Sequence, residues 1–159
     1  MAIMQSIKPE YCALIAQGEK TIELRKSIPK DLIPPFKVYI YCTSVKHMNL
    51  DEYVRLHQAT GGRIDDWHGK VIGEYICDYI AEYGLRYDMY GYDIPEDEMS
   101  ATCLTGNELW QYGGGKILYG QRISALKIYN EPKYLCEFKS KGFPLRKPPQ
   151  SWYYVKELV

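Results

Sequence analysis

The stretch GEKTIELRK, Gly18 to Lys26, combines the alternation of a β-strand with an unusual density of charge. Residues 21–26 alternate between polar and apolar side chains, which predicts a strand. Charged side chains nevertheless make up more than half of the stretch: Glu19, Lys20, Glu23, Arg25 and Lys26. A strand of this kind is either a solvated edge or one wall of a ligand cleft.

Alternation divides this strand into two faces. Successive side chains point to opposite sides, so Ile22 and Leu24 share one face while Glu23 and Arg25 share the other. Arginine offers a planar fork to a phosphate or carbonyl group, and glutamate accepts from an amino or imino group. The two side chains could therefore contact a base edge and its phosphate, or form a surface ion pair of little energy.

The elements around this strand predict an α+β fold that is mainly β. A helix is predicted over residues 9–17, because Pro9 stands in its first turn and Gly18 just past its end. Further strands are predicted at 3–7, 37–43, 70–80, 118–129 and 151–155, and helices at 50–60 and 105–113. Thr105 and Glu108 form a capping-box pattern, and Gly73 predicts a bulge or bend. Strands and helices do not alternate strictly. We therefore expect about six strands in a mixed β-barrel, with helices at its openings.

Length and composition are those of one ordered domain over residues 1–159. Apolar residues make up 46% of the chain and charged residues 25%, which is ordinary for a globular protein. The segment 84–100, GLRYDMYGYDIPEDEMS, has weak periodicity and predicts an inserted, lid-like loop.

The charge distribution excludes a uniformly basic surface for nonspecific nucleic-acid binding, but it allows a local positive groove. The formal net charge is zero. Residues 1–48 hold seven Lys and Arg against four acids, and residues 133–147 hold five against one. Residues 74–98 hold eight acids and one base. If the two basic segments share a face, they form a positive groove.

Cysteine and histidine spacing predicts no metal site and no cofactor. The five cysteines form no C-x-x-C pair, and the three histidines lack metal-site spacing, which favours a reducing compartment. The first residues, MAIMQSIKPEY, lack the apolar core of a signal peptide, and no apolar run has membrane length. We expect a soluble, cytoplasmic protein without membrane contact.

The helix, glycine and strand together, KPEYCALIAQGEKTIELRK, resemble the ASCH family of the PUA-like superfamily. The family signature G-x-K-x-x-E-x-R is intact as Gly18, Lys20, Glu23 and Arg25. The resemblance is clear over residues 3–43 and looser as far as the 118–129 strand. It implies a PUA-like barrel whose cleft, at the helix–strand junction, is lined by the signature residues. It also implies an association with RNA or nucleic-acid binding.

The first functional hypothesis is a module that binds RNA or a nucleotide-like small molecule. Unstacked bases can lie on aromatic faces, for which Tyr41, Trp110, Trp152 and Tyr153 are candidates. Lys8 begins a helix, where a cation makes most sense facing an anion or solvent. The candidate ligand-binding residues are Lys8, Lys20, Glu23, Arg25, Tyr41, Thr43, Ser151 and Trp152.

The second hypothesis is a hydrolase. Proteins resembling this one include amidohydrolases acting on acetylated cytidine and ribonucleases, and the amidohydrolase pattern pairs a lysine with a threonine three residues later. Here Glu23 stands three residues after Lys20, where that pattern has threonine. A carboxylate cannot replace the hydroxyl as nucleophile without a change of mechanism. Glu23, or less favourably Glu74, would act as general base, with Lys20 and Arg25 stabilising negative charge. Glu74 shares strand parity with Ile72 and Ile76, or is a water-exposed barrel end.

A third hypothesis makes the acidic, tyrosine-rich segment 84–100 a contact surface for an unknown protein partner.

Overall fold

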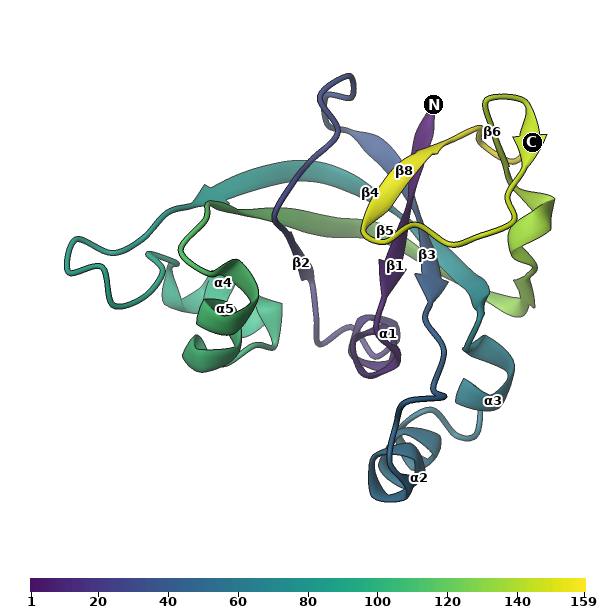
Figure 1. The fold of residues 1–159 in the computed structure, drawn as a ribbon, viewed down its shortest axis with the longest axis horizontal. Helices are drawn as coiled ribbons and strands as arrows, with labels where there is room; N and C mark the ends of the chain where they lie inside the picture. The colour runs from purple at the N-terminus through teal and green to yellow at the C-terminus, as the bar shows by residue number, and fades with distance from the viewer.

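Six strands form one mixed sheet in the computed structural model, which describes residues 1–159 (Figure 1). Their order across the sheet is β2-β5-β4-β3-β1-β8. Only β1 and β3 pair in parallel, and the other neighbours are antiparallel. The expected mixed sheet of about six strands is confirmed. The bounds are β1 Ala2–Ile7, β2 Ile22–Arg25, β3 Phe36–Cys42, β4 Lys70–Tyr83, β5 Leu118–Lys133 and β8 Trp152–Val155.

Five α-helices accompany the sheet, and all of them are drawn below it in the view of Figure 1. They are α1 Pro9–Ala16, α2 Leu50–Ala59, α3 Ile64–Trp67, α4 Glu96–Thr102 and α5 Gly106–Gly113. The helices predicted at 9–17, 50–60 and 105–113 are confirmed, including the capping box of α5. Helices α3 and α4 were not predicted. Because α4 begins at Glu96, segment 84–100 is a loop only in its first part; three consecutive acids in the first turn of α4 favour the helix.

The remaining elements lie between β5 and β8. A short 3₁₀ helix, Leu135–Glu137, precedes a two-stranded ribbon of β6, Lys139–Ser140, and β7, Phe143–Pro144. This ribbon lies at the opposite end of the longest axis from the 84–95 loop (Figure 1).

The sheet does not close, so the predicted closed barrel is wrong. Strands β2 and β8 are both edges, and no backbone ladder joins them. The guanidinium of Arg25 instead bridges the gap, donating to the carbonyl oxygens of Ser6 at 2.8 Å and Ser151 at 3.3 Å. The indole of Trp152 donates to the Ser27 carbonyl oxygen at 3.2 Å. Side chains thus take the place of strand pairing beside the GEKTIELRK stretch.

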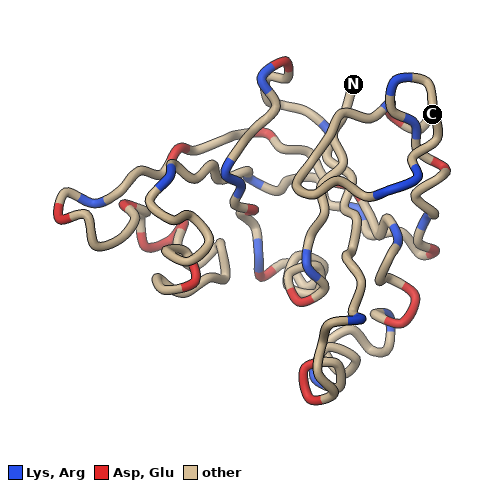
Figure 2. The backbone as a smooth tube through the Cα atoms, viewed as in Figure 1, with Lys and Arg blue, Asp and Glu red and all other residues tan.

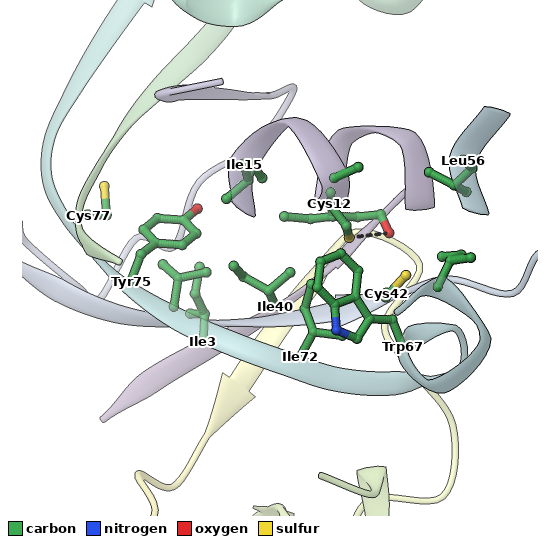
Figure 3. Close-up of a cluster of buried hydrophobic side chains, with 14 of the residues drawn as sticks. Ile3, Cys12, Ile15, Ile40, Cys42, Leu56, Trp67, Ile72, Tyr75 and Cys77 are labelled. Atoms are coloured by element: carbon green, nitrogen blue, oxygen red, sulfur yellow. Dashed lines mark hydrogen bonds between the residues drawn. The ribbon is translucent and has the colours of Figure 1, made fainter. Parts of the chain in front are cut away.

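Helix α1 covers part of the inner face of the sheet and builds the main core there. Cys12 and Ile15 of α1 pack over the β-strand residues Ile40 and Ile72, with Trp67 at the end of α3 (Figure 3). A second cluster on the outer face includes Met4, Tyr39, Tyr41 and Phe138. A third joins β2 to α5 through Ile22, Leu24 and Leu109. Both faces of β2 are therefore covered.

The bulge predicted at Gly73 is confirmed, and it reverses the faces of β4. The registers with β3 and β5 both shift between Val71 and Gly73. Ile72 and Tyr75 consequently share the inner core, while Glu74 faces outward. The expected shared parity of Ile72 and Glu74 is wrong because the bulge inserts one residue into the alternation.

We predict that Gly73→Ala lowers the free energy of unfolding by about 1–3 kcal/mol. A β-carbon at Gly73 would overlap the carbonyl oxygen of Lys127 and lie 3.1 Å from Cα of Ile128 on β5. Urea unfolding measures the effect, with Gly84→Ala as control because a β-carbon there meets nothing within 4 Å. Equal urea midpoints for the two variants would contradict the close approach of β4 and β5.

Candidate functional site

Three residues of the GEKTIELRK stretch are the only buried charged residues of the chain. Lys20 is 2% exposed, Glu23 7% and Arg25 6%. Lys20 lies in the turn before β2, and Glu23 and Arg25 lie on its inner face. The interpretation of this strand as a solvated edge, with a surface ion pair, is therefore wrong.

The three charges contact one another and fixed backbone groups. Glu23 Oε1 accepts from Arg25 Nη2 at 3.0 Å, and Glu23 Oε2 faces Lys20 Nζ at 3.6 Å, beyond hydrogen-bonding distance. Lys20 Nζ donates to the carbonyl oxygen of Thr102, at the end of α4, at 2.6 Å. The same ammonium lies 5.1 Å from the ring centroid of Tyr11. The Lys20 ammonium is therefore held by a carbonyl oxygen, a carboxylate and an aromatic ring. The Arg25 guanidinium is held by the same carboxylate and by backbone carbonyl oxygens.

A buried amide and hydroxyl network continues this site across the sheet. Gln121 of β5 is paired directly with Glu23 of β2. Its Oε1 accepts from Gln5 Nε2 at 2.8 Å and lies 2.8 Å from the Tyr75 hydroxyl. Gln5 and Gln121 are fully buried. Four strands, β1, β2, β4 and β5, therefore contribute polar side chains to one interior.

Three atoms of this interior have no hydrogen-bond partner. They are Glu23 Oε2, Arg25 Nε and Gln121 Nε2, and they are the only buried side-chain polar atoms in the chain in that condition. Buried polar groups are nearly always paired, since leaving one unpaired costs free energy. Two cations against one carboxylate also leave a buried excess of one positive charge. The site thus offers two donors and one acceptor to a ligand.

Two of the other predicted site residues lie beside this cluster. Ser151 accepts from Arg25 Nη1 at its carbonyl oxygen and, at 3.4 Å, at its hydroxyl. Trp152 is half-buried, is paired with Gln5 across β1 and β8, and packs edge-on against Tyr154. The structure therefore brings Ser151 and Trp152 to the open edge of the site, which is the side where the edge strands β2 and β8 do not pair.

The remaining candidates lie elsewhere or only nearby. Lys8 is exposed at the N-terminus of α1, and Thr43 follows β3 with its amide donating to the Ile7 carbonyl oxygen. Tyr41 is buried in the outer-face cluster. Glu74 also lies on the outer face, paired with Lys37 at 3.3 Å and accepting from the Tyr129 hydroxyl at 2.6 Å. The structure does not bring Tyr41 or Glu74 to Lys20.

Sequence reasoning missed Gln5, Tyr75 and Gln121. A signal was present, because Gln5 is the single amide in the apolar strand AIMQSI, and Gln121 interrupts LYGQRIS after a glycine. Lone amides in apolar strands predict buried hydrogen-bonding partners.

The hydroxyl of Tyr75 makes stability sensitive to alkaline pH. Burial, reinforced by the charge of Glu23, raises its pKa well above the ordinary value of 10.0. The folded state therefore holds this proton more tightly than the unfolded chain. The resulting stabilisation is complete below about pH 10 and is lost as the pH rises above it toward the folded pKa.

We predict that Tyr75→Phe removes part of this alkaline sensitivity. Above pH 10 the wild-type protein loses up to about 1.4 kcal/mol per pH unit through this one group, and the variant does not. At neutral pH the variant is less stable by about 1–3 kcal/mol because the amide network loses its hydroxyl. Urea unfolding of both proteins at several pH values measures the two slopes, and parallel slopes would contradict the assignment.

No three side chains of the His, Cys, Asp or Glu type gather where they could hold a metal ion. None of the helices has both the length and the apolar character needed to span a membrane.

Comparison with known proteins identifies the fold. No protein-family model matches the chain, and no curated protein sequence matches it. The crystal structure of ASCH from Zymomonas mobilis superposes with a TM-score of 0.65 at 18% identity, covering 98% of this chain and 88% of that one. A serine-to-alanine variant of that protein gives a TM-score of 0.64 at 18% identity, covering 98% and 89%. A tyrosine-to-phenylalanine variant gives 0.57 at 16% identity, covering 98% and 91%. The chain therefore has an ASCH-domain fold, as its helix–glycine–strand signature predicted.

Proposed function

We propose that this protein binds RNA or a nucleotide-like ligand at the site formed by Lys20, Glu23 and Arg25. The observation that carries the proposal is the set of three unpartnered buried atoms, Glu23 Oε2, Arg25 Nε and Gln121 Nε2. In an interior that otherwise pairs its polar groups, they are the groups that a ligand would satisfy.

The chemistry of these atoms suits a nucleotide. The donors on Arg25 and Gln121 match phosphate or carbonyl oxygens, and the Glu23 carboxylate matches an amino or imino group. The buried excess of positive charge favours an anionic ligand. Trp152, at the open edge, offers a face on which a base can stack. The ASCH fold supports RNA by analogy only, since a fold does not determine a ligand.

Ligand entry requires part of the covering structure to move. The three charged side chains are nearly closed off from solvent, and Lys20 is held by the Thr102 carbonyl oxygen at the end of α4. When a ligand displaces this carbonyl oxygen, the Lys20 ammonium can donate to oxygen atoms of the ligand instead. We therefore expect binding to change the mobility of α4.

Hydrolysis of a modified nucleoside or of RNA is the second candidate function. It is favoured by Glu23 Oε2, a buried carboxylate oxygen without a hydrogen-bond partner, 3.6 Å from the Lys20 ammonium. A carboxylate in this position can accept a proton from water while Lys20 and Arg25 stabilise negative charge on the reacting group. Glu74, on the outer face, is not placed for this role.

A paired binding and turnover screen tests both functions. Wild type and Lys20→Ala are incubated with short RNA, short DNA and modified nucleosides, with Lys30→Ala as an exposed-lysine control. We expect ligand-dependent thermal stabilisation of the wild type and the control, and its loss in Lys20→Ala. Product seen by mass spectrometry only with an intact Lys20 would establish the hydrolase. RNA affinity should also fall as salt rises. Equal stabilisation of all three proteins would overturn the site assignment.

A further inference from the structure

A hollow lined by aromatic side chains lies between the 84–95 loop, α4 and α5. Its volume is about 700 Å³, and none of its lining residues belongs to the Lys20 site. Tyr90 is 86% exposed and Trp110 42% exposed at this hollow. Large apolar side chains gathered at a concave surface mark a contact site. The side chains that form it include Arg86, Tyr90, Tyr92, Ile94, Met99 and Trp110.

The surroundings of the hollow are acidic. Residues 84–98 contain five acids and one base, Arg86. Arg86 is itself partly neutralised, because its Nε lies 3.5 Å from Asp88 Oδ1 and its Nη2 donates to the Tyr90 carbonyl oxygen. Asp93, Glu96 and Asp97 are exposed. The lining itself contains one charged residue, the cation Arg86, and the acids occupy flanking positions in the same segment, here called the acidic rim. Their charge repels the phosphates of RNA and favours a cationic partner with an apolar anchor.

The β6–β7 ribbon of the same chain has that chemistry. Residues 139–147, KSKGFPLRK, contain four bases and no acid. Phe143 is 75% exposed just after the tight turn at Lys141 and Gly142, which have φ angles of 50° and 85°. Arg146 and Lys147 follow it and are exposed. The ribbon thus presents one aromatic ring between cations.

We propose that the hollow receives the β6–β7 ribbon of a second copy of this chain. Phe143 enters among the aromatic side chains, and Arg146 and Lys147 face the acidic rim. The 84–95 loop, which supplies part of the lining of the hollow, and the ribbon lie at opposite ends of the longest axis (Figure 1), with acids concentrated near the loop and bases near the ribbon (Figure 2). One chain therefore cannot make this contact with itself. The net charge of zero removes the repulsion that would keep copies apart.

Sedimentation velocity on the full chain tests the contact. We expect the mean mass to rise with protein concentration at low salt and to return to the monomer at high salt, because the charges are exposed and screened. Phe143→Ser, at an exposed position, should weaken association at least tenfold. A wild type that stays monomeric at low salt and high concentration would overturn the proposal.

Charge reversal distinguishes this contact from general electrostatic attraction. Glu96→Lys/Asp97→Lys and Arg146→Glu/Lys147→Glu should each be monomeric, and their mixture should associate because each ribbon then meets an oppositely charged hollow. Lys30→Glu/Lys46→Glu makes the same net charge change as the ribbon variant at exposed positions elsewhere and should associate like the wild type. Loss of association in this control would contradict the ribbon as the contact.

A peptide separates a second copy from a different partner. The peptide KSKGFPLRK should quench Trp110 fluorescence and dissolve the wild-type assembly. Peptide binding to a chain that is always monomeric would overturn the second copy as occupant and assign the hollow to another basic protein. Quenching by short RNA but not by the peptide would overturn the charge argument itself.

Discussion

Replacing Arg25 by alanine will lower the free energy of unfolding by about 3–5 kcal/mol. The guanidinium connects the edge strand β2 to the carbonyl oxygens of Ser6 on β1 and of Ser151 just before the other edge strand β8, and it pairs with Glu23 at 3.0 Å. Alanine leaves the carboxylate without its closest cation and both carbonyl oxygens without this donor. Chemical unfolding followed by circular dichroism measures the loss.

Two further variants separate the charge of Arg25 from its shape. Arg25→Lys keeps the charge but loses the fork, so it should recover less than half of the lost stability. Glu23→Gln/Arg25→Met removes both charges of the pair and should be more stable than Arg25→Ala, because no carboxylate is left beside the missing guanidinium. A stability loss under 1 kcal/mol for Arg25→Ala would show that the bridge between the edges contributes little.

The elements nearest the opening stretch could be predicted because their signals are local. Pro9 and Gly18 delimit α1, and Gly18 adopts a positive φ of 78° that suits glycine. The bulge at Gly73 could be predicted for the same reason. Its consequence for Glu74 was missed, because strand parity holds only up to the inserted residue. A single bulge thus places Glu74, the less favoured of the two candidate bases, on the face opposite to the one that simple alternation with Ile72 predicts.

Burial of the charges could not be predicted from the stretch itself. It depends on α4, about eighty residues later in the chain, whose last turn accepts from the Thr21 amide at Ala101 and from Lys20 at Thr102. The gap between the edge strands β2 and β8 could not be predicted either. The contacts of Arg25 across it are to residues far away in the sequence, on β1 and just before β8. Alternation predicts which side chains share a face, but not what covers that face.

From the proposed function we predict that replacing Glu23 by glutamine weakens the binding of a nucleoside monophosphate by about 10–150-fold while sparing inorganic phosphate. In the proposed complex the carboxylate accepts from an amino or imino group of the base, and a neutral amide is a weaker acceptor. Because Lys20 and Arg25 both present donors to position 23, the new NH₂ group must also face one of these cations. Inorganic phosphate needs only the donors, and removal of the carboxylate increases the positive charge that attracts it.

Isothermal titration of both ligands against wild type and Glu23→Gln measures the two effects separately. Lys20→Met/Glu23→Gln is the matched control for stability, because it removes one cation with the anion and restores the excess of one positive charge. It should unfold at a higher urea concentration than Glu23→Gln yet still bind the monophosphate weakly. Equal weakening of phosphate and monophosphate would instead make Glu23 a support for Arg25, with no contact of its own to the base.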